Sequence, residues 1–193
     1  MTRIPIYLIT NRYLVSSEKY FLTIKEAAEY DNLKIILREK DLNDHEYKEL
    51  YLKIKEMIPE KEIIINSKVN VLKDVKEKSI QLSFNDFIIL GKVTEKVGVS
   101  VHSVEEAIIA DQKGADYLLV SHIFETSCKK GLPPKGIKLI QEVKAKVKCK
   151  VIALGGINAE NFHDTIAAGA DGIAIMSLLF YSDSIKAQIE KFN

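Results

Sequence analysis

The chain alternates between short apolar runs, rich in β-branched residues, and longer charged segments whose apolar positions recur at helical spacing. Runs that are apolar at nearly every position are typical of strands buried on both faces, as in a parallel sheet. Eight such runs are predicted as strands, at residues 5–10, 33–37, 62–66, 79–82, 96–101, 116–120, 150–154 and 172–176. The segments between them are predicted as helices, so the order along the chain is that of an α/β protein.

Two of the helical segments carry clear signals for their ends. Ser103 stands three residues before Glu106, which predicts a capping box at the start of a helix, and Gly114 is placed to stop that helix. A second helix is predicted over residues 158–170, with Asn158 as its cap.

Eight strand–helix units in 193 residues predict a compact (β/α)8 TIM barrel that forms a single domain over residues 1–193. Barrels of this type commonly have about 250 residues, so the helices and loops must be short. A doubly wound open sheet is the alternative. In a barrel, the active site lies at the C-terminal ends of the strands, and polar residues or glycine follow nearly all of the predicted strands.

Charge and composition exclude several classes of protein. The net charge of +1 gives no field that favours nucleic acid or a membrane surface. Two cysteines do not make a disulfide framework, and no apolar run is long enough for a transmembrane helix. The apolar run at the N-terminus is interrupted by Pro5 and matches a first strand better than a signal peptide. We therefore expect a cytoplasmic protein that acts on a small molecule.

The seventh and eighth strands are followed by residues suited to phosphate. Gly155 and Gly156 lie between a strand and a helix, where backbone N–H groups can approach a ligand without a Cβ in the way. Ser177 comes directly after the last strand. Barrels often bind phosphate with these two loops, so we predict a phosphate site. The alternative is that the two glycines only form a tight turn.

The loop after the sixth strand, "SHIFETSCKKG" at residues 121–131, collects titratable groups. An imidazole is able both to accept and to donate a proton, which makes His122 a candidate for proton transfer. The alternative for His122 is a hydrogen-bonded side chain that packs the rim of the barrel. Cys128 lies beside two lysines, which would lower the pKa of its thiol. His102 is a second acid–base candidate, although a capping or supporting role fits it better.

Several motifs together resemble the thiamine phosphate synthase superfamily. They are "YLIT", "ILREK", "SVHSVEEAIIADQKGADYLLVSHIFETSCKKG" and "VIALGGINAENFHDTIAAGADGIAIMS", and the similarity is strongest over residues 98–180. The resemblance implies the (β/α)8 barrel and two alternative activities. Thiamine phosphate synthase joins a hydroxymethylpyrimidine diphosphate to a thiazole phosphate. The TenI-like branch contains thiazole tautomerases, which aromatise a thiazole carboxylate phosphate by moving a proton.

Departures from the synthase pattern favour the TenI-like branch. The synthase has an Asn-Asp pair for Mg²⁺ after the third strand, and this chain has Asn66 and Ser67. Ile36 stands where the synthase motif after the second strand has Gln, while His122 and Cys128 replace a Pro and a Thr of the sixth loop. The resemblance therefore predicts a thiazole tautomerase, an isomerase in which His122 carries the proton and no metal or cofactor is needed.

The resemblance also implies residues that bind the substrate, here a thiazole phosphate. Arg38 can hold a carboxylate bidentately, and the hydroxyls of Ser100 and Thr126 can donate to phosphate or carboxylate oxygens. Lys129 matches a lysine that the synthase uses for phosphate, and Lys40 is a further candidate. No covalent step is needed, which argues against Cys128 as a nucleophile. Barrels of this family often form dimers, so a homodimer is a further expectation.

Two other functions stay open. The first is a divergent thiamine phosphate synthase, a transferase that would need Mg²⁺ on the pyrimidine diphosphate. The second is a TenI-like regulatory protein that binds a thiazole phosphate without turnover.

Overall fold

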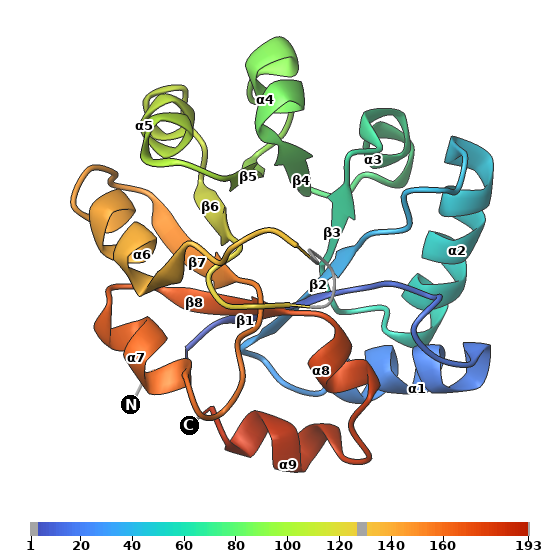
Figure 1. Ribbon diagram of the computed structural model, residues 1–193. Helices are drawn as coiled ribbons and strands as arrows, with labels where there is room; N and C mark the ends of the chain where they lie inside the picture. Colours follow the sequence, from blue (N-terminus) through green and yellow to red (C-terminus); the bar gives the residue numbers. More distant parts are fainter. Residues whose placement is uncertain (1–3, 127–130, 193) are drawn as a thin grey trace.

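The computed structural model describes residues 4–126 and 131–192, and within them the eight strands form one closed parallel barrel (Figure 1). The strands are β1 (Ile6–Ile9), β2 (Leu33–Leu37), β3 (Ile63–Asn66), β4 (Ser79–Ser83), β5 (Lys96–Val101), β6 (Tyr117–Ser121), β7 (Lys150–Leu154) and β8 (Gly172–Ile175). Each strand pairs with its neighbours in the sequence, and β8 pairs with β1. This closure confirms the predicted (β/α)8 barrel and excludes the open sheet, and the strand positions agree with the prediction to within a few residues.

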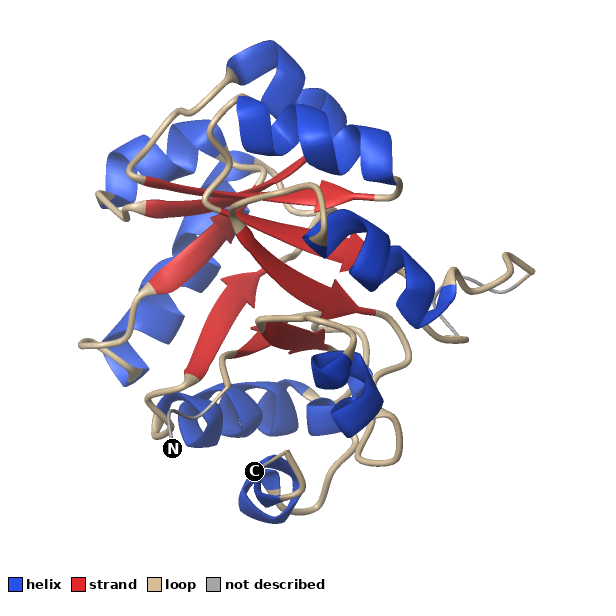
Figure 2. Ribbon diagram, turned by 90° about the vertical axis from the view of Figure 1, so that its left-hand side faces the viewer, coloured by secondary structure: helices blue, strands red, loops and turns tan. Residues whose placement is uncertain are grey.

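Helices surround the barrel on its outside (Figure 2). They are α1 (Ser17–Ala28), α2 (Asp44–Met57), α3 (Val69–Val75), α4 (Phe84–Leu90), α5 (Val104–Gln112), α6 (Gly136–Lys144), α7 (Phe162–Ala167), α8 (Ser177–Phe180) and α9 (Ile185–Glu190). Several are only one or two turns long, which is how the barrel fits into a short chain. Among the described residues, no helix is long and apolar enough to cross a membrane.

Residues of six strands alternate between two separate cores, whereas β4 and β5 supply apolar residues to the larger core only. The larger core lies between the strands and the helices, and it contains residues such as Leu8, Ile35 and Val99. The smaller core fills the barrel interior and contains Tyr7 and Tyr117, whose ring centroids are 5.1 Å apart. Because side chains along a strand point alternately to opposite faces, one apolar run supplies both cores.

The predicted helix ends are only partly right. Ser103 caps α5 by accepting from the N–H of Glu106, as expected, but the Glu106 carboxylate accepts from the N–H of His102 and not from that of Ser103. The predicted start of the helix at residues 158–170 is wrong, because α7 begins four residues later. Asn158 and Asn161 instead bond each other's backbone N–H groups, which holds a turn before the helix.

Gly98 of β5 is a position at which the interior of the barrel has no room for a side chain. A Cβ there would lie 2.1 Å from Cζ of Tyr117 and 2.4 Å from Oε1 of Gln81. Both neighbours are buried, so neither can move without disturbing the interior core.

We expect Gly98→Ala to lower the free energy of unfolding by about 2 kcal/mol, because it overpacks the barrel interior. Urea denaturation followed by circular dichroism measures the change. Ile89→Ala on the exposed face of α4 is the control, since Ile89 is 81% exposed and its truncation should change stability little. Equal stability of Gly98→Ala and the wild type would contradict the close packing over Gly98.

Candidate active site

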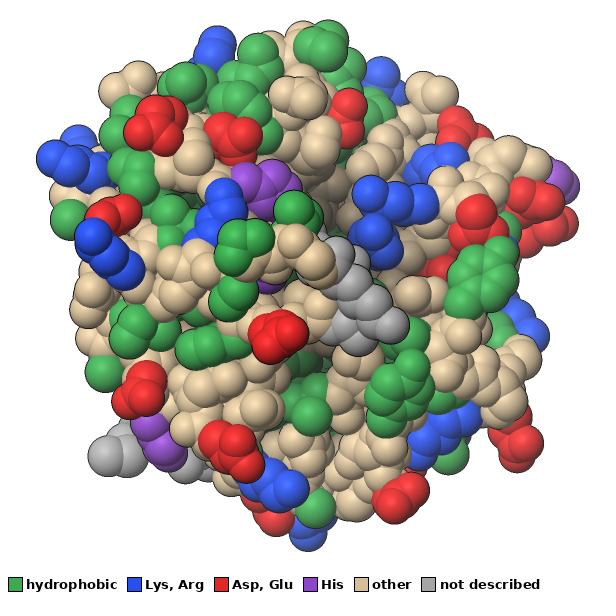
Figure 3. All heavy atoms as spheres, in the orientation of Figure 1, with side chains coloured by type: hydrophobic (Ala, Val, Ile, Leu, Met, Phe, Trp, Pro, Cys, Tyr) green, Lys and Arg blue, Asp and Glu red, His purple; other side chains and the backbone are tan. Residues whose placement is uncertain are grey.

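A pocket of about 260 Å³ opens at the C-terminal ends of β1, β2, β6, β7 and β8. Figure 3 looks onto this face and shows a hollow near its centre, with a histidine and Lys or Arg side chains at its edges. The pocket brings together six of the residues predicted from the sequence, namely Arg38, His122, Thr126, Gly155, Gly156 and Ser177. These residues are separated by up to 139 positions in the chain (177 − 38) and meet because parallel strands of a barrel end on one face.

Two predicted site residues within the described part of the chain, Ser100 and Lys40, do not line the pocket. Ser100 lies at the end of β5 but does not line the pocket, and its hydroxyl accepts a hydrogen bond from Nε2 of Gln81 at 3.0 Å. Lys40 is exposed and does not line the pocket either. Lys129 and Cys128 lie outside the described residues, so their predicted roles stay predictions.

His122 is 4% exposed and lies directly after β6. Its Nε2 is 3.3 Å from the carbonyl oxygen of Leu132, and because a carbonyl only accepts, Nε2 carries the proton in this contact. Within the described part of the chain, Nδ1 is buried and has no hydrogen-bond partner. His122 therefore has an unused polar atom, which a ligand in the pocket could bond.

His102 has a supporting position. Its Nδ1 lies 3.0 Å from the carbonyl oxygen and 3.1 Å from Oγ of Ser121, the residue that precedes His122. The ring itself is exposed and does not line the pocket. This geometry agrees with the capping or supporting role that the sequence favoured for His102.

The two glycines after β7 let the loop after β6 pack directly onto them. A Cβ on Gly155 would lie 2.6 Å from Cβ of His122, and a Cβ on Gly156 would lie 2.3 Å from the carbonyl oxygen of Glu125. Both glycines also have positive φ, at 107° and 67°, which disfavours other residues. Gly155 thus seats His122 and Gly156 seats the loop at Phe124 and Glu125, while both glycines line the pocket.

A second hollow of about 450 Å³ adjoins the first, between the loops after β6 and β7 and the helices α8 and α9. The two hollows share Thr126, Gly156 and Ser177. Ser177 is half-buried at the first position of α8. Two of the three predicted phosphate residues, Gly156 and Ser177, therefore border both hollows, while Gly155 lines only the first.

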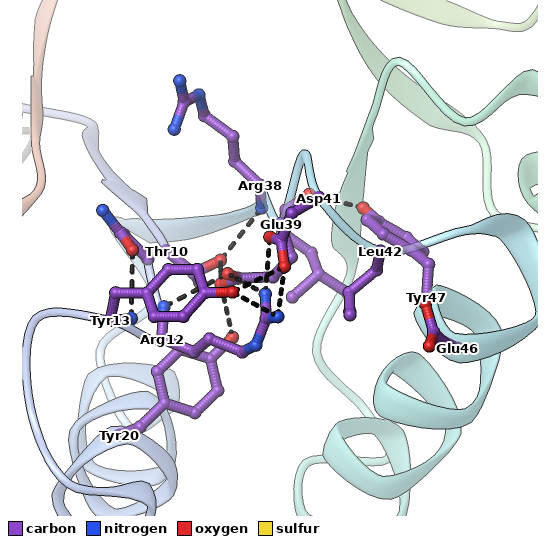
Figure 4. A network of polar contacts seen from close by, with 12 residues as sticks. Thr10, Arg12, Tyr13, Tyr20, Arg38, Glu39, Asp41, Leu42, Glu46 and Tyr47 are labelled. Atoms are coloured by element: carbon purple, nitrogen blue, oxygen red, sulfur yellow. Dashed lines mark hydrogen bonds and ion pairs between the residues drawn. The ribbon is translucent and has the colours of Figure 1, made fainter.

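Arg38 provides the positive charge on the opposite side of the pocket. It follows β2, and its backbone N–H donates to Oγ1 of Thr10 at 2.9 Å. The Arg38 guanidinium extends away from the surrounding polar network (Figure 4) and forms no hydrogen bond or ion pair with any residue that the structure describes. Arg38 forms no ion pair with the adjacent Glu39 in the described structure, since the Glu39 carboxylate bonds Thr10, Arg12 and Tyr20.

The side chains after β3 and β4 do not fit a Mg²⁺ site. Asn66 donates to Oγ of Ser67 at 2.7 Å, so this pair offers no carboxylate. Asp86 is the carboxylate at the start of α4, and it is 2.7 Å from Oγ of Ser83. Mg²⁺ prefers carboxylate oxygens, and the described residues contain no group of three or more acidic, His or Cys side chains that could hold a metal.

We expect Gly155→Ala to lower the free energy of unfolding by about 3 kcal/mol, because it adds a clash with His122 to the cost of a positive φ. Gly114→Ala is the matched control, since Gly114 also has a positive φ of 88° but no atom within 4 Å of an added Cβ. The free energy of unfolding of this control should fall by only about 1 kcal/mol. Equal losses in urea denaturation would show that backbone strain alone makes glycine necessary at position 155.

Comparison with known proteins identifies relatives along nearly the whole chain. A family model described as thiamine monophosphate synthase matches residues 6–179. Thiamine-phosphate synthase from Clostridium acetobutylicum is 31% identical over 189 residues, which covers 94% of this chain and 89% of the relative. The protein of the same name from Pyrococcus horikoshii is 31% identical over 196 residues, covering 97% and 92%. The structure of thiamine phosphate pyrophosphorylase from Pyrococcus furiosus superposes with a TM-score of 0.81 at 27% identity, covering 98% of this chain and 93% of that one.

These relatives overturn one expectation from the sequence. The expected thiazole tautomerase, and with it the isomerase class, is wrong, because the relatives carry the name of a synthase, a transferase. None of these matches assigns the chain to the TenI-like branch. The length of the match and the agreement in fold support one conclusion at the level of the family: the chain belongs to the thiamine monophosphate synthase family.

Proposed function

We propose that the protein is a thiamine-phosphate synthase that joins a hydroxymethylpyrimidine diphosphate to a thiazole phosphate. The proposal rests on one observation: two sets of groups that can each bind an anion line the same pocket. The Arg38 guanidinium lies on one side, and Gly155, Gly156 and Ser177 lie on the other. The names of the relatives support the same reaction class.

The reaction needs binding and orientation more than proton transfer. The bond between the pyrimidine methylene carbon and the diphosphate oxygen breaks, and the bonding electrons leave with the diphosphate. The lone pair of the thiazole nitrogen forms the new bond to that carbon. This nitrogen carries no proton, so no base has to remove one. The pocket must hold the two reactants in line and stabilise the charge of the leaving group.

Arg38 suits the diphosphate, because a guanidinium can bond two phosphate oxygens at once. His122 lies across the pocket, and in its protonated form Nδ1 becomes a second donor while Nε2 keeps its contact with Leu132. Lys40 and Lys129 remain candidates for additional positive charge near the diphosphate. In this proposal His122 is a hydrogen-bond donor to the leaving group.

The phosphate of the thiazole suits the other side of the pocket. Gly155 and Gly156 have no Cβ to block the approach of an oxygen to the backbone, and Ser177 adds a hydroxyl beside them. Thr126 borders both hollows and is a further hydroxyl at this position. Ser100 stays a weaker candidate because it lies outside the pocket lining.

The resemblance to the synthase implies Mg²⁺ on the diphosphate, but the side chains after β3 and β4 do not supply the carboxylates that such a site requires. The proposal therefore assigns no step to a metal. In this proposal the positive charge for the diphosphate comes from Arg38, the one Lys or Arg residue among those that line the described pocket.

We expect purified protein to form thiamine phosphate from the two substrates, with release of one diphosphate for each product. Arg38→Ala should lower kcat/KM by about a hundredfold, because it removes a charged, two-pronged contact to the leaving group. Arg38→Lys should be intermediate, since an ammonium cannot bond bidentately. The assay follows diphosphate release and product fluorescence after oxidation.

Lys92→Ala serves as the control in this assay, because Lys92 pairs with Asp116 near the other end of the barrel. Failure of the wild type to form product would refute the proposed function. Full activity of Arg38→Ala would leave the function standing but remove the assigned role of Arg38.

We also expect the thiazole phosphate to bind without a metal, with the same Kd in Mg²⁺ and in EDTA. Ser177→Ala should weaken this binding by about tenfold, because one hydrogen bond to a charged oxygen is lost. Isothermal titration calorimetry measures both effects. A Kd that depends strongly on Mg²⁺ would contradict the assignment of the phosphate to the glycines and Ser177.

A further inference from the structure

Glu39 is a buried carboxylate next to the pocket that has so far been given no role. It is 3% exposed, although it directly follows Arg38, whose side chain lines the pocket. Successive side chains of an extended segment point to opposite sides, so Arg38 faces the pocket while Glu39 faces the layer between β1 and α1. Buried carboxylates are rare unless they are paired and hydrogen-bonded.

Three side chains and one backbone group bond the Glu39 carboxylate (Figure 4). Oε1 accepts from Oγ1 of Thr10 at 2.8 Å and from the hydroxyl of Tyr20 at 3.0 Å. Oε2 accepts from the backbone N–H of Arg12 at 3.1 Å and lies 3.4 Å from its Nη1. The partners come from the end of β1, the loop after β1 and helix α1, so one carboxylate ties three segments to the end of β2.

The network continues outward through Arg12. Its guanidinium bonds both carboxylate oxygens of Asp41 and also Tyr13, whose hydroxyl is 2.8 Å from Asp41. Hydrogen bonds from Arg12 and Tyr13 hold the pKa of Asp41 below its ordinary value. Burial, with Glu39 as a nearby negative charge, raises the pKa of Tyr20, so its hydroxyl stays a donor. Glu39 and Asp41 thus balance the charge of Arg12, whereas Arg38 has no acidic partner among the described residues.

One hydrogen bond links this network to Arg38. Thr10 is fully buried, and its hydroxyl donates to Glu39 while it accepts from the backbone N–H of Arg38 at 2.9 Å. A hydroxyl has a single proton, so the bond to Glu39 fixes its direction and leaves the oxygen lone pairs for Arg38. Glutamine at position 39 keeps only one accepting oxygen, and its NH2 group would face donors, so the set of bonds that orients the Thr10 hydroxyl cannot be kept in full.

We propose that Glu39 is a positioning residue that acts through Thr10 to hold the backbone of Arg38, so that the guanidinium is presented to a diphosphate in the pocket. The inference rests on the proposed function for the identity of the anion. It also assigns Thr10 a role in binding although Thr10 does not line the pocket.

The test measures the affinity for inorganic pyrophosphate by calorimetry, together with kcat and KM of the coupling reaction. We expect Glu39→Gln to weaken pyrophosphate binding by about tenfold, since the amide disturbs the set of donors around the carboxylate. Thr10→Val, which keeps the shape but loses the hydroxyl, should have a similar effect. Thr10→Ser keeps the hydroxyl and should restore the affinity to within about twofold.

A double substitution separates positioning of Arg38 from a general loss of structure. If Glu39 acts through Arg38, Glu39→Gln adds almost nothing to the loss already caused by Arg38→Ala. The matched control is Glu77→Gln, because Glu77 also accepts from a tyrosine and a lysine but precedes β4 at the opposite end of the barrel. This control should leave pyrophosphate affinity unchanged.

Each outcome decides the inference. The inference is overturned if Glu39→Gln binds pyrophosphate as tightly as the wild type. It is also overturned if Glu39→Gln weakens binding by the same factor in the Arg38→Ala background as in the wild type. If Glu39→Gln fails to fold, the Thr10→Val and Thr10→Ser pair carries the same comparison. A wild type that binds pyrophosphate but makes no product would refute the proposed function and leave the inference standing. A wild type that does not bind pyrophosphate would overturn the inference.

Discussion

The structure depends on closure of the parallel sheet between β1 and β8. A strand at an open edge leaves unpaired N–H and C=O groups, and closure gives each strand a neighbour on both sides. Closure also brings the ends of β2 and β8 to one face, although they are far apart in the sequence. Arg38 and Ser177 can line the same pocket only because the sheet is closed.

Close approach of backbone segments decides the shape of the site. The loop after β6 rests on Gly155 and Gly156, and its backbone N–H groups bond the end of β7, for example Ile123 with Leu154 at 3.0 Å. This packing presses His122 against the wall of the pocket and leaves its Nδ1 unpaired within the described residues. Gly155 therefore seats His122, and both glycines line the pocket without a Cβ.

The electrostatic design of the pocket differs from one built on carboxylates and a divalent cation. Glu39 is saturated by donors from Thr10, Arg12 and Tyr20, and the loop after β3 carries an amide and a hydroxyl in place of a carboxylate. The charge that faces the pocket is the guanidinium of Arg38. Such a site suits anionic reactants that are bound and aligned by cations and backbone dipoles.

The sequence by itself determined the strands, the closed fold and the gathering of most candidate site residues at one face, because strand and helix periods are local and parallel strands of a barrel end on one face. On the activity, single replacements such as Ser67 and His122 are misleading, because relatives that match along nearly the whole chain are named synthases. Only the tertiary structure decided that Lys40 and Ser100 lie outside the pocket and that Glu39 is buried beneath it. The partners of Glu39 are 19 to 29 residues away in the sequence, and no local pattern encodes contacts that form when separate segments pack.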